Sequence, residues 1–431
     1  MRKALVLTIC LLVATTASAD LEVIITEGGV KQRPIAVVPF GWSGQDAEAP
    51  IDVASVIAAD LKRSGRFDPM AEDGMLQKPT VGADLDFDDW SILKVEAVVI
   101  GRIEQTGANA YNVQFQLFDP FRREQLVGYR MPASKGTMRR VAHRLADMIY
   151  EELTGIKGVF ATKVTYVTAD RNGNDTTYRL VVADFDGENE TVIMESTDPI
   201  MSPAWSPDSR RIAYVSFEDQ RSSIFVQTLR TGNRIKVSSR PGINGAPSFS
   251  PDGRQLVITQ GGVDGNLDIY VLDLVSRQTR RLTEHRAIDT EGTWSPDGRY
   301  IYFTSDRSGG PQVYRVPVSG GTPERVTFEG SYNARPRLSP DGNKLAVVHN
   351  DRGNFRIAVM DLGRKDMLIL SAGSQDESPS FAPNSDTLIY ATRQRRNGVL
   401  ETVSADGLIR QRLASRQGDV REPVWSPFER F

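Results

Sequence analysis

Cysteine is almost absent from this chain of 431 residues, because the sequence contains a single one, Cys10. That residue lies in an apolar run, Ala4 to Ala14, which follows Arg2-Lys3 and precedes Ala17-Ser18-Ala19. A basic start, an apolar centre and small residues in this order are typical of a secretory signal, here residues 1–19, that is cleaved after export. The mature chain would then have no disulfide, no thiolate nucleophile and no cysteine-based metal site.

Basic charge, histidine and long hydrophobic runs are also scarce. The formal net charge is −3, so no basic excess indicates nucleic acid as a partner. Residues 4–14 fall short of the roughly 20 apolar residues that span a bilayer, and no other stretch is longer. Only three histidines are present, and no Gly-x-Ser-x-Gly elbow supplies a serine nucleophile. We therefore expect an exported protein that does not span the membrane, is no enzyme, and holds no cofactor or metal.

The second half of the chain contains a short motif that occurs six times. The copies begin at intervals of 43 to 45 residues, which is a period typical of propeller blades. Their Ser-Pro-Asp-Gly core predicts a tight turn, because proline fixes φ at the second position and glycine accepts a left-handed conformation at the last. Each turn joins two strands, and four strands make a blade, so the motif predicts a six-bladed all-β propeller. The copies start at Pro203, Pro247, Gly292, Pro336, Pro379 and Pro423.

The two ends of the repeat region complement each other. Residues 160–195 contain three strand-like segments without a preceding motif, whereas the motif at Pro423 has no strands after it before the last residue, Phe431. We therefore expect the C-terminal strand to enter the blade begun by residues 160–195. This pairing closes the ring and removes two free sheet edges.

The residues before the repeats alternate between strand and helix patterns. A helix is predicted over Asp52–Arg63 and a longer one from Met138 to about Gly155, because apolar residues recur there at helical spacing. Strands are predicted at residues 34–40, 96–103, 111–117 and 125–130, which together indicate a small α/β domain with a mixed sheet. The predicted division is a signal peptide at 1–19, an N-terminal tail at 20–32, an α/β domain at 33–157 and the propeller at 158–431.

Three features of this first part have ordinary interpretations. His143 lies beside Arg139, Arg140 and Arg144, which predicts a solvated helix face and no site. The acidic segment from Asp84 to Asp89 precedes a short helix predicted from Trp90, where carboxylates favour the helix dipole. The tail from residue 20 to residue 26 alternates weakly, so it is either an edge strand or a mobile terminal segment.

The segments just before each turn carry the candidate binding residues. By analogy with WD-repeat propellers, the strand before each turn lines the central channel, so the residues upstream of it meet at one mouth. Apolar anchors within a ring of polar groups suit a peptide or protein ligand. The candidates are Met201, Ile243, Asn244, Ala246, Thr290, Glu291, Tyr332, Asn333, Arg335, Asp376, Glu377, Arg421 and Glu422.

An export signal, a small α/β domain and six such repeats together resemble the TolB family, the periplasmic component of the Tol-Pal system of Gram-negative bacteria. The most specific stretches are Arg33–Phe40 (RPIAVVPF), Leu153–Gly158 (LTGIKG), Met201–Pro207 and Asn244–Gly253. The resemblance covers essentially the whole chain. The repeat alone is shared with prolyl oligopeptidase-type propellers. Asn384-Ser385 and Phe428-Glu429 replace the family's Asp-Gly, so these two turns are expected to differ.

The resemblance implies a non-enzymatic adaptor that links the outer-membrane lipoprotein Pal to the inner-membrane TolA complex. Such an adaptor maintains envelope integrity and aids outer-membrane constriction in cell division. Family members bind Pal at the propeller mouth, where some colicins also bind, and other outer-membrane proteins are further candidate partners. Charge reversal at Glu291 or Arg335 is therefore expected to weaken Pal binding. The alternative is a periplasmic propeller hydrolase or lyase, which requires a nucleophile with a base, or a metal cluster, in one cleft.

The resemblance also assigns a role to the N-terminal tail. In the family this tail contacts TolA when it is released, and otherwise packs between the domains. The matching residues here are Asp20, Leu21, Glu22, Val23, Ile24, Ile25, Thr26 and Glu27.

Overall fold

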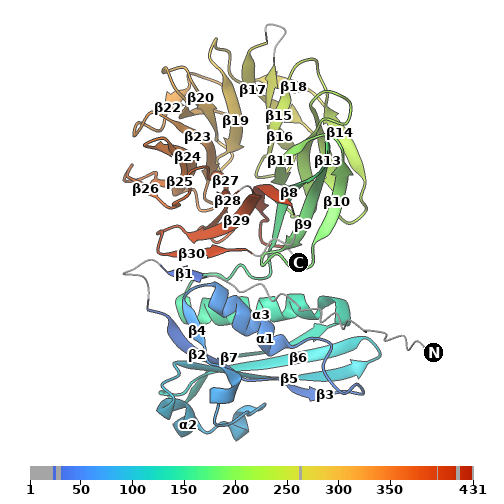
Figure 1. Cartoon of the computed structure of the whole chain (residues 1–431), viewed down its shortest axis with the longest axis vertical. Helices are drawn as coiled ribbons and strands as arrows, with labels where there is room; N and C mark the ends of the chain where they lie inside the picture. The colour runs from blue at the N-terminus through green and yellow to red at the C-terminus, as the bar shows by residue number, and fades with distance from the viewer. Residues whose placement is uncertain (1–22, 26–30, 262–264, 396, 414–417, 430–431) are drawn as a thin grey trace, which may run out of the picture.

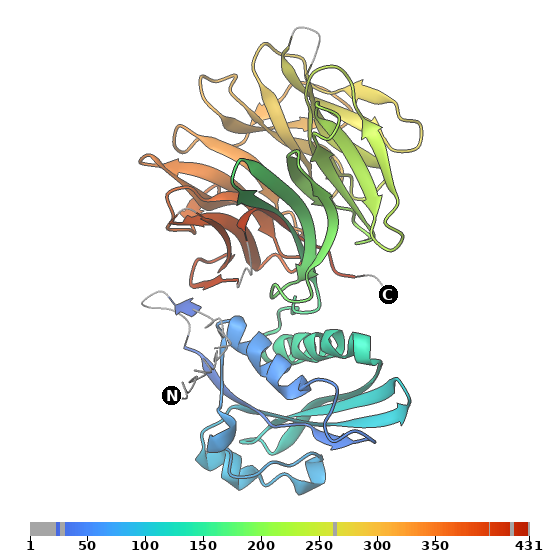
Figure 2. The same cartoon turned by 45° about the vertical axis from the view of Figure 1, so that its right-hand side comes forward.

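The computed structural model describes residues 23–25, 31–261, 265–395, 397–413 and 418–429. These residues form a small α/β domain and a six-bladed β-propeller, as the sequence predicts (Figure 1). The signal peptide predicted at residues 1–19 lies outside the described residues. In both views the helices α1 (Val53–Arg63) and α3 (Met138–Thr154) of the α/β domain face the propeller, and the sheet lies beyond them (Figures 1 and 2).

The α/β domain is built on a mixed sheet of six strands. Strand β2 pairs in parallel with β4 and β5, β3 pairs in parallel with β5, and β5, β6 and β7 form an antiparallel meander. The meander confirms the predicted pairing of residues 111–117 with 125–130, whereas β3 and β4 were not predicted. The strands are β2 (Arg33–Val37), β3 (Gly41–Ser43), β4 (Phe67–Pro69), β5 (Ala97–Gly107), β6 (Ala110–Asp119) and β7 (Glu124–Ala133).

Two helices cover one face of this sheet. Helix α1 (Val53–Arg63) begins after Asp52, whose side chain accepts a hydrogen bond from the backbone N–H of Ser55. Helix α3 (Met138–Thr154) ends at Gly155, which has φ of 72° and is a left-handed C-cap. Both helices agree with the prediction. The short helix α2 (Phe87–Ile92) begins three residues earlier than predicted, because the side chain of Asp86 caps it.

The propeller consists of six antiparallel sheets around a ring. The first contains β8 (Lys163–Asn172), β9 (Asp175–Asp184), β10 (Thr191–Ser196) and, from the other end of the chain, β31 (Asp419–Trp425). The next three are β11 (Ile200–Trp205) to β14 (Arg234–Ser238), β15 (Asn244–Phe249) to β18 (Thr279–Arg281), and β19 (Asp289–Trp294) to β22 (Glu324–Arg325). The last two are β23 (Asn333–Leu338) to β26 (Met367–Ile369) and β27 (Glu377–Phe381) to β30 (Ile409–Arg412).

The two middle strands of each of these five blades have the following bounds. They are β12 (Arg211–Ser216), β13 (Ser223–Thr228), β16 (Gln255–Gly261), β17 (Leu267–Asp273), β20 (Tyr300–Ser305) and β21 (Gln312–Pro317), then β24 (Lys344–Asp351), β25 (Asn354–Asp361), β28 (Thr387–Gln394) and β29 (Asn397–Ser404). Strand order follows chain order in each of these blades.

The ring closes as predicted, because β31 pairs antiparallel with β8. The indole N–H of Trp425 donates to the hydroxyl of Thr162 over 2.7 Å, and the backbone N–H of Ser426 donates to the carbonyl of Lys163 over 2.8 Å. The first sheet of the propeller therefore contains both ends of the repeat region. We call it the closing blade.

The turn at Asn384-Ser385 keeps the shape of the other turns, contrary to the expectation from its sequence. Ser385 has φ of 63°, close to the 69° of Gly253 at the same repeat position. Asn384 replaces the repeat aspartate, because its carbonyl oxygen accepts from the backbone N–H of Asp386 over 3.1 Å. The hydroxyl of Ser385 also accepts from the backbone N–H of Asp341 in the neighbouring blade, over 3.1 Å.

Candidate functional site

The first strand of each repeat lines the central channel, as predicted. Strands β11, β15, β19, β23, β27 and β31 contact one another in that order around the ring. Each of them carries a bulge that shifts its register. The residue before the motif has a left-handed φ between 45° and 56° in every blade, although none is glycine. These six residues are Ser202, Ala246, Glu291, Arg335, Ser378 and Glu422.

Three of these six residues form an ion-pair network inside the channel. The guanidinium of Arg335 lies 2.8 Å from Glu291 and 3.8 Å from Glu422, and it also bonds to the hydroxyl of Ser378. Burial alone would lower the pKa of Arg335, but the two carboxylates raise it. Burial raises the pKa of Glu422, against the opposing effect of Arg335. Charge reversal at Glu291 or Arg335 would therefore disturb the channel itself as well as any partner contact.

Three of the predicted contact residues are buried and hold loops of the scaffold. Asn244 and Asn333 are 0% exposed and Asp376 is 1% exposed. The amide of Asn333 donates to the carbonyl of Glu329 over 2.7 Å, and Asp376 accepts from the backbone N–H of Gly373 over 3.0 Å. With Asp289 they occupy one repeat position in four blades. This recurrence is a sequence signal for a structural role.

The residue just before that position forms an apolar arc on the mouth of three consecutive blades. Ile243 is 51% exposed and Ile288 is 48% exposed. Tyr332 is half-buried and packs edge-to-face on Phe355, with ring centroids 5.1 Å apart. The sequence prediction missed Ile288 and Phe355. The position of Ile288, which matches that of Ile243 and Tyr332 in the repeat, could have identified it.

Beside the arc, the mouth opens into a cleft of about 370 Å³ between three blades. Five predicted residues line it, together with Arg393, which was not predicted. The five are Tyr332, Arg335, Asp376, Glu377 and Arg421. Arg421 lies 2.9 Å from Asp419, and this hydrogen bond raises the pKa of Arg421. Met201, Ala246 and Thr290 are partly exposed elsewhere on the inner strands. The mouth thus combines apolar and charged parts.

The predicted tail contributes a strand to the propeller. Strand β1 (Val23–Ile25) pairs antiparallel with β30, with Val23 opposite Gln411 and Ile25 opposite Ile409. It lies between the two domains and adds a fifth strand to the last blade (Figure 1). The edge-strand alternative therefore holds for these three residues. Asp20, Leu21, Glu22, Thr26 and Glu27 lie outside the described residues.

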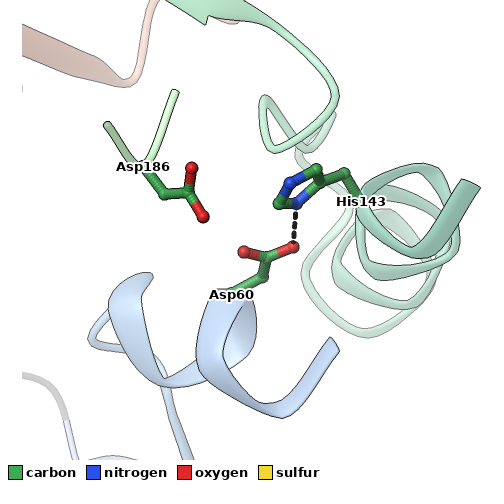
Figure 3. A group of neighbouring side chains, drawn as sticks. All are labelled: Asp60, His143 and Asp186. Atoms are coloured by element: carbon green, nitrogen blue, oxygen red, sulfur yellow. Dashed lines mark hydrogen bonds and ion pairs between the residues drawn. The ribbon is translucent and has the colours of Figure 1, made fainter. Parts of the chain in front are cut away.

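His143 is buried, so the prediction of a solvated helix face is wrong for it. It is 1% exposed, because α1 and the turn after β9 cover this side of α3. Its Nδ1 lies 2.6 Å from the carboxylate of Asp60, and Asp186 completes a group whose polar atoms lie within 4.8 Å of one another (Figure 3). Such residues can hold a cation, but Arg63 and Arg139 already neutralise both carboxylates. The group is therefore an internal ion-pair network.

Within the part of the chain that the structure describes, no helix has the length and apolar character to cross a membrane. A family model described as the TolB amino-terminal domain matches residues 21–126, and one described as the TolB beta propeller domain matches residues 150–429.

Relatives and solved structures agree with these family models. The Tol-Pal system protein TolB of Xanthomonas oryzae pv. oryzae is 48% identical over 417 residues, which are 96% of this chain and 95% of the relative. The crystal structure of TolB from Acinetobacter baumannii superposes with a TM-score of 0.86 at 40% identity, and the match covers 95% of this chain and 100% of that one. The chain therefore belongs to the TolB family of Tol-Pal system proteins.

Proposed function

We propose that the protein is a non-enzymatic periplasmic adaptor that connects the outer-membrane lipoprotein Pal with the inner-membrane TolA complex. Membership of the TolB family supports a role in the Tol-Pal system. In that role it would maintain envelope integrity and aid outer-membrane constriction during division, and colicins would be further ligands. We keep the division into signal peptide (1–19), tail (20–32), α/β domain (33–157) and propeller (158–431) as part of this proposal.

The observation that carries the proposal is the composition of the propeller mouth. Protein interfaces combine a few apolar or aromatic anchors with a charged and polar rim. Ile243, Ile288 and Tyr332 provide such anchors on three blades, and Arg393 and Arg421 provide charge in the adjoining cleft. We assign Pal to this surface. The buried Asn244 and Asn333 lie behind it as loop supports, and the buried Asp376 belongs to the wall of the cleft.

Truncating Tyr332 to alanine is expected to weaken binding of the soluble domain of Pal about 30-fold, which corresponds to about 2 kcal/mol. The ring is half-buried on Phe355 and lines the cleft, so its loss removes an anchor and leaves a gap. Calorimetric titration of the full mature chain measures the effect. Val275→Ala is the matched control, because Val275 is an apolar residue on the outer β17–β18 turn and is 87% exposed. If Tyr332→Ala binds as tightly as this control, the mouth is not the Pal surface.

We assign the TolA site to the tail. A strand of three paired residues contributes only a few hydrogen bonds, each worth about 0.5–1.5 kcal/mol net. The docked tail can therefore exchange with a free tail at modest cost, and a partner that binds the free form shifts this equilibrium. If the docked and free forms differ in their affinity for Pal, then Pal and TolA binding are coupled.

Deleting residues 20–27 is expected to abolish TolA capture in a pull-down, because the proposed contact segment is removed. The mouth variant provides the reciprocal control. Tyr332→Ala should still capture TolA, and the tail deletion should still bind Pal. Retention of TolA by the deletion variant would show that the tail is not the TolA site, and loss of TolA by both variants would contradict two separate sites.

The alternative of a propeller hydrolase or lyase has less support. Among the described residues, the group that combines histidine with carboxylates is Asp60, His143 and Asp186. This group is buried between the domains. It does not line the mouth cleft, which is the place that a substrate could reach.

A further inference from the structure

The buried ion-pair network joins the two domains. Asp60 comes from α1, His143 from α3 and Asp186 from the β9–β10 turn of the closing blade (Figure 3). Arg63 also lies on α1, and Arg139 also lies on α3. Arg139 lies 2.5 Å and Arg63 lies 3.7 Å from the carboxylate of Asp186. Asp60, His143 and Asp186 are at most 5% exposed. We call these five residues the latch.

The protonation of His143 sets the charge of the latch. Two carboxylates and two guanidinium groups cancel, so the imidazole decides whether the group is neutral or positive. Burial alone would lower the pKa of His143, but the hydrogen bond to Asp60 and the charges of Asp60 and Asp186 raise it. Burial also raises the pKa of Asp60. The pair therefore retains a proton to higher pH than a free histidine would.

The groups that face His143 come from every element packed around it. Asp60 and Arg63 face it from α1, Arg139 and Asp147 lie on its own helix, and Asp186 faces it from the closing blade. The ring of Phe185 meets the imidazole edge-to-face with centroids 5.6 Å apart. The Nε2 atom of His143 is buried and has no hydrogen-bond partner. The negative charge that faces His143 from the propeller is thus that of Asp186.

We propose that protonation of the latch strengthens the contact between the α/β domain and the propeller. When the domains are together, a proton on the His143–Asp60 pair is attracted by Asp186. When they separate, His143 keeps Asp60, which belongs to its own domain, but loses Asp186. In the closed form the attraction of Asp60 and Asp186 outweighs the opposing effect of burial. The closed form therefore binds the proton more tightly, and by linkage the domain contact is strongest at low pH and weakens as pH rises through the titration of His143.

The first test follows the three histidines by NMR. With only three in the chain, His285→Gln and His349→Gln assign the imidazole signals directly. We expect His143 to titrate above the ordinary value of about 6.5, and Asp186→Asn to lower this midpoint by about 1 unit, because one nearby carboxylate is removed. An unchanged midpoint in Asp186→Asn would overturn the proposal, because the proton would then not depend on the other domain.

The second test measures domain separation. Because the mature chain is expected to lack cysteine, spin labels can be placed at the exposed positions Lys135→Cys and Arg230→Cys, one in each domain. The distance distribution should broaden as pH rises through the midpoint of His143 in the otherwise unchanged protein, but not in His143→Gln. His349→Gln is the matched control, because His349 is buried within one blade and its ring bonds to Asn333.

Three results would contradict this proposal. The distance distribution could broaden equally in His143→Gln, or it could stay constant while His143 titrates. Either result would show that the domain contact does not depend on this proton. Loss of the closed form in EDTA and its recovery with Zn²⁺ would identify a metal site instead. If His143→Gln does not fold, the titration midpoint in Asp186→Asn still decides the question.

Discussion

Replacing Trp425 by alanine is expected to lower the free energy of unfolding by about 3–5 kcal/mol, the usual cost of truncating a buried tryptophan. The side chain is 5% exposed and belongs to a core that also contains Ile57 of α1, Leu145 of α3 and Ile389 of the last blade. Its indole also donates to Thr162 on the opposite end of the repeat region. The substitution therefore leaves a cavity at ring closure and at the domain contact together.

The matched control is Trp294→Ala, at the same repeat position in a middle blade. Trp294 is 8% exposed, and its indole donates to the carbonyl of Ser248 over 3.1 Å, but its core cluster contains propeller residues only. Both variants should lose comparable stability in urea unfolding. Only Trp425→Ala should split the calorimetric transition into separate transitions of the two domains. A single transition in Trp425→Ala, or a loss below about 1 kcal/mol, would be incompatible with this role of the closing strand.

The parts of the fold that the sequence predicts are those that depend on local repetition. The backbone preferences of proline and glycine explain the Ser-Pro-Asp turns, and the spacing of these turns gives the number of blades. Closure follows because the strands missing at one end are present at the other. Helix α3 follows from its apolar spacing and from Gly155.

The parts that escaped prediction depend on long-range contacts or on side chains that do not favour the backbone they adopt. Ala246 and Glu291 have left-handed φ values, yet neither residue type signals such a conformation. His143 looked solvated because its sequence neighbours are arginines, but its partner Asp60 lies 83 residues away. Ile288 escaped prediction because the polar residues 289–291 that follow it gave the stronger binding signal.

Folding stability is expected to fall by about 4 kcal/mol between pH 4 and pH 8 because of one residue, Asp147. Burial raises the pKa of this carboxyl to about 7, although it accepts hydrogen bonds from the backbone N–H groups of Phe160 and Ala161 over 2.6 and 3.1 Å. The value in an unfolded chain is about 3.9. The folded protein therefore holds this proton more tightly, so the contribution is complete below about pH 4 and is lost as pH rises through about 7.

Asp147→Asn should flatten this dependence, because an amide does not ionise while its carbonyl can still accept a hydrogen bond. Urea unfolding at intervals between pH 4 and pH 8 measures the slope, with the exposed Glu151→Gln on the same helix as the control. An unchanged slope in Asp147→Asn would show that Asp147 is ionised throughout.

Asp186 has the opposite effect on the pH dependence of stability. Because its pKa is lowered in the folded protein, its contribution to stability is present at neutral pH and is lost only in acid. Asp147 anchors the segment that leads into the propeller, and its proton acts in the same direction as that of His143. Rising pH should therefore weaken the domain junction through both residues.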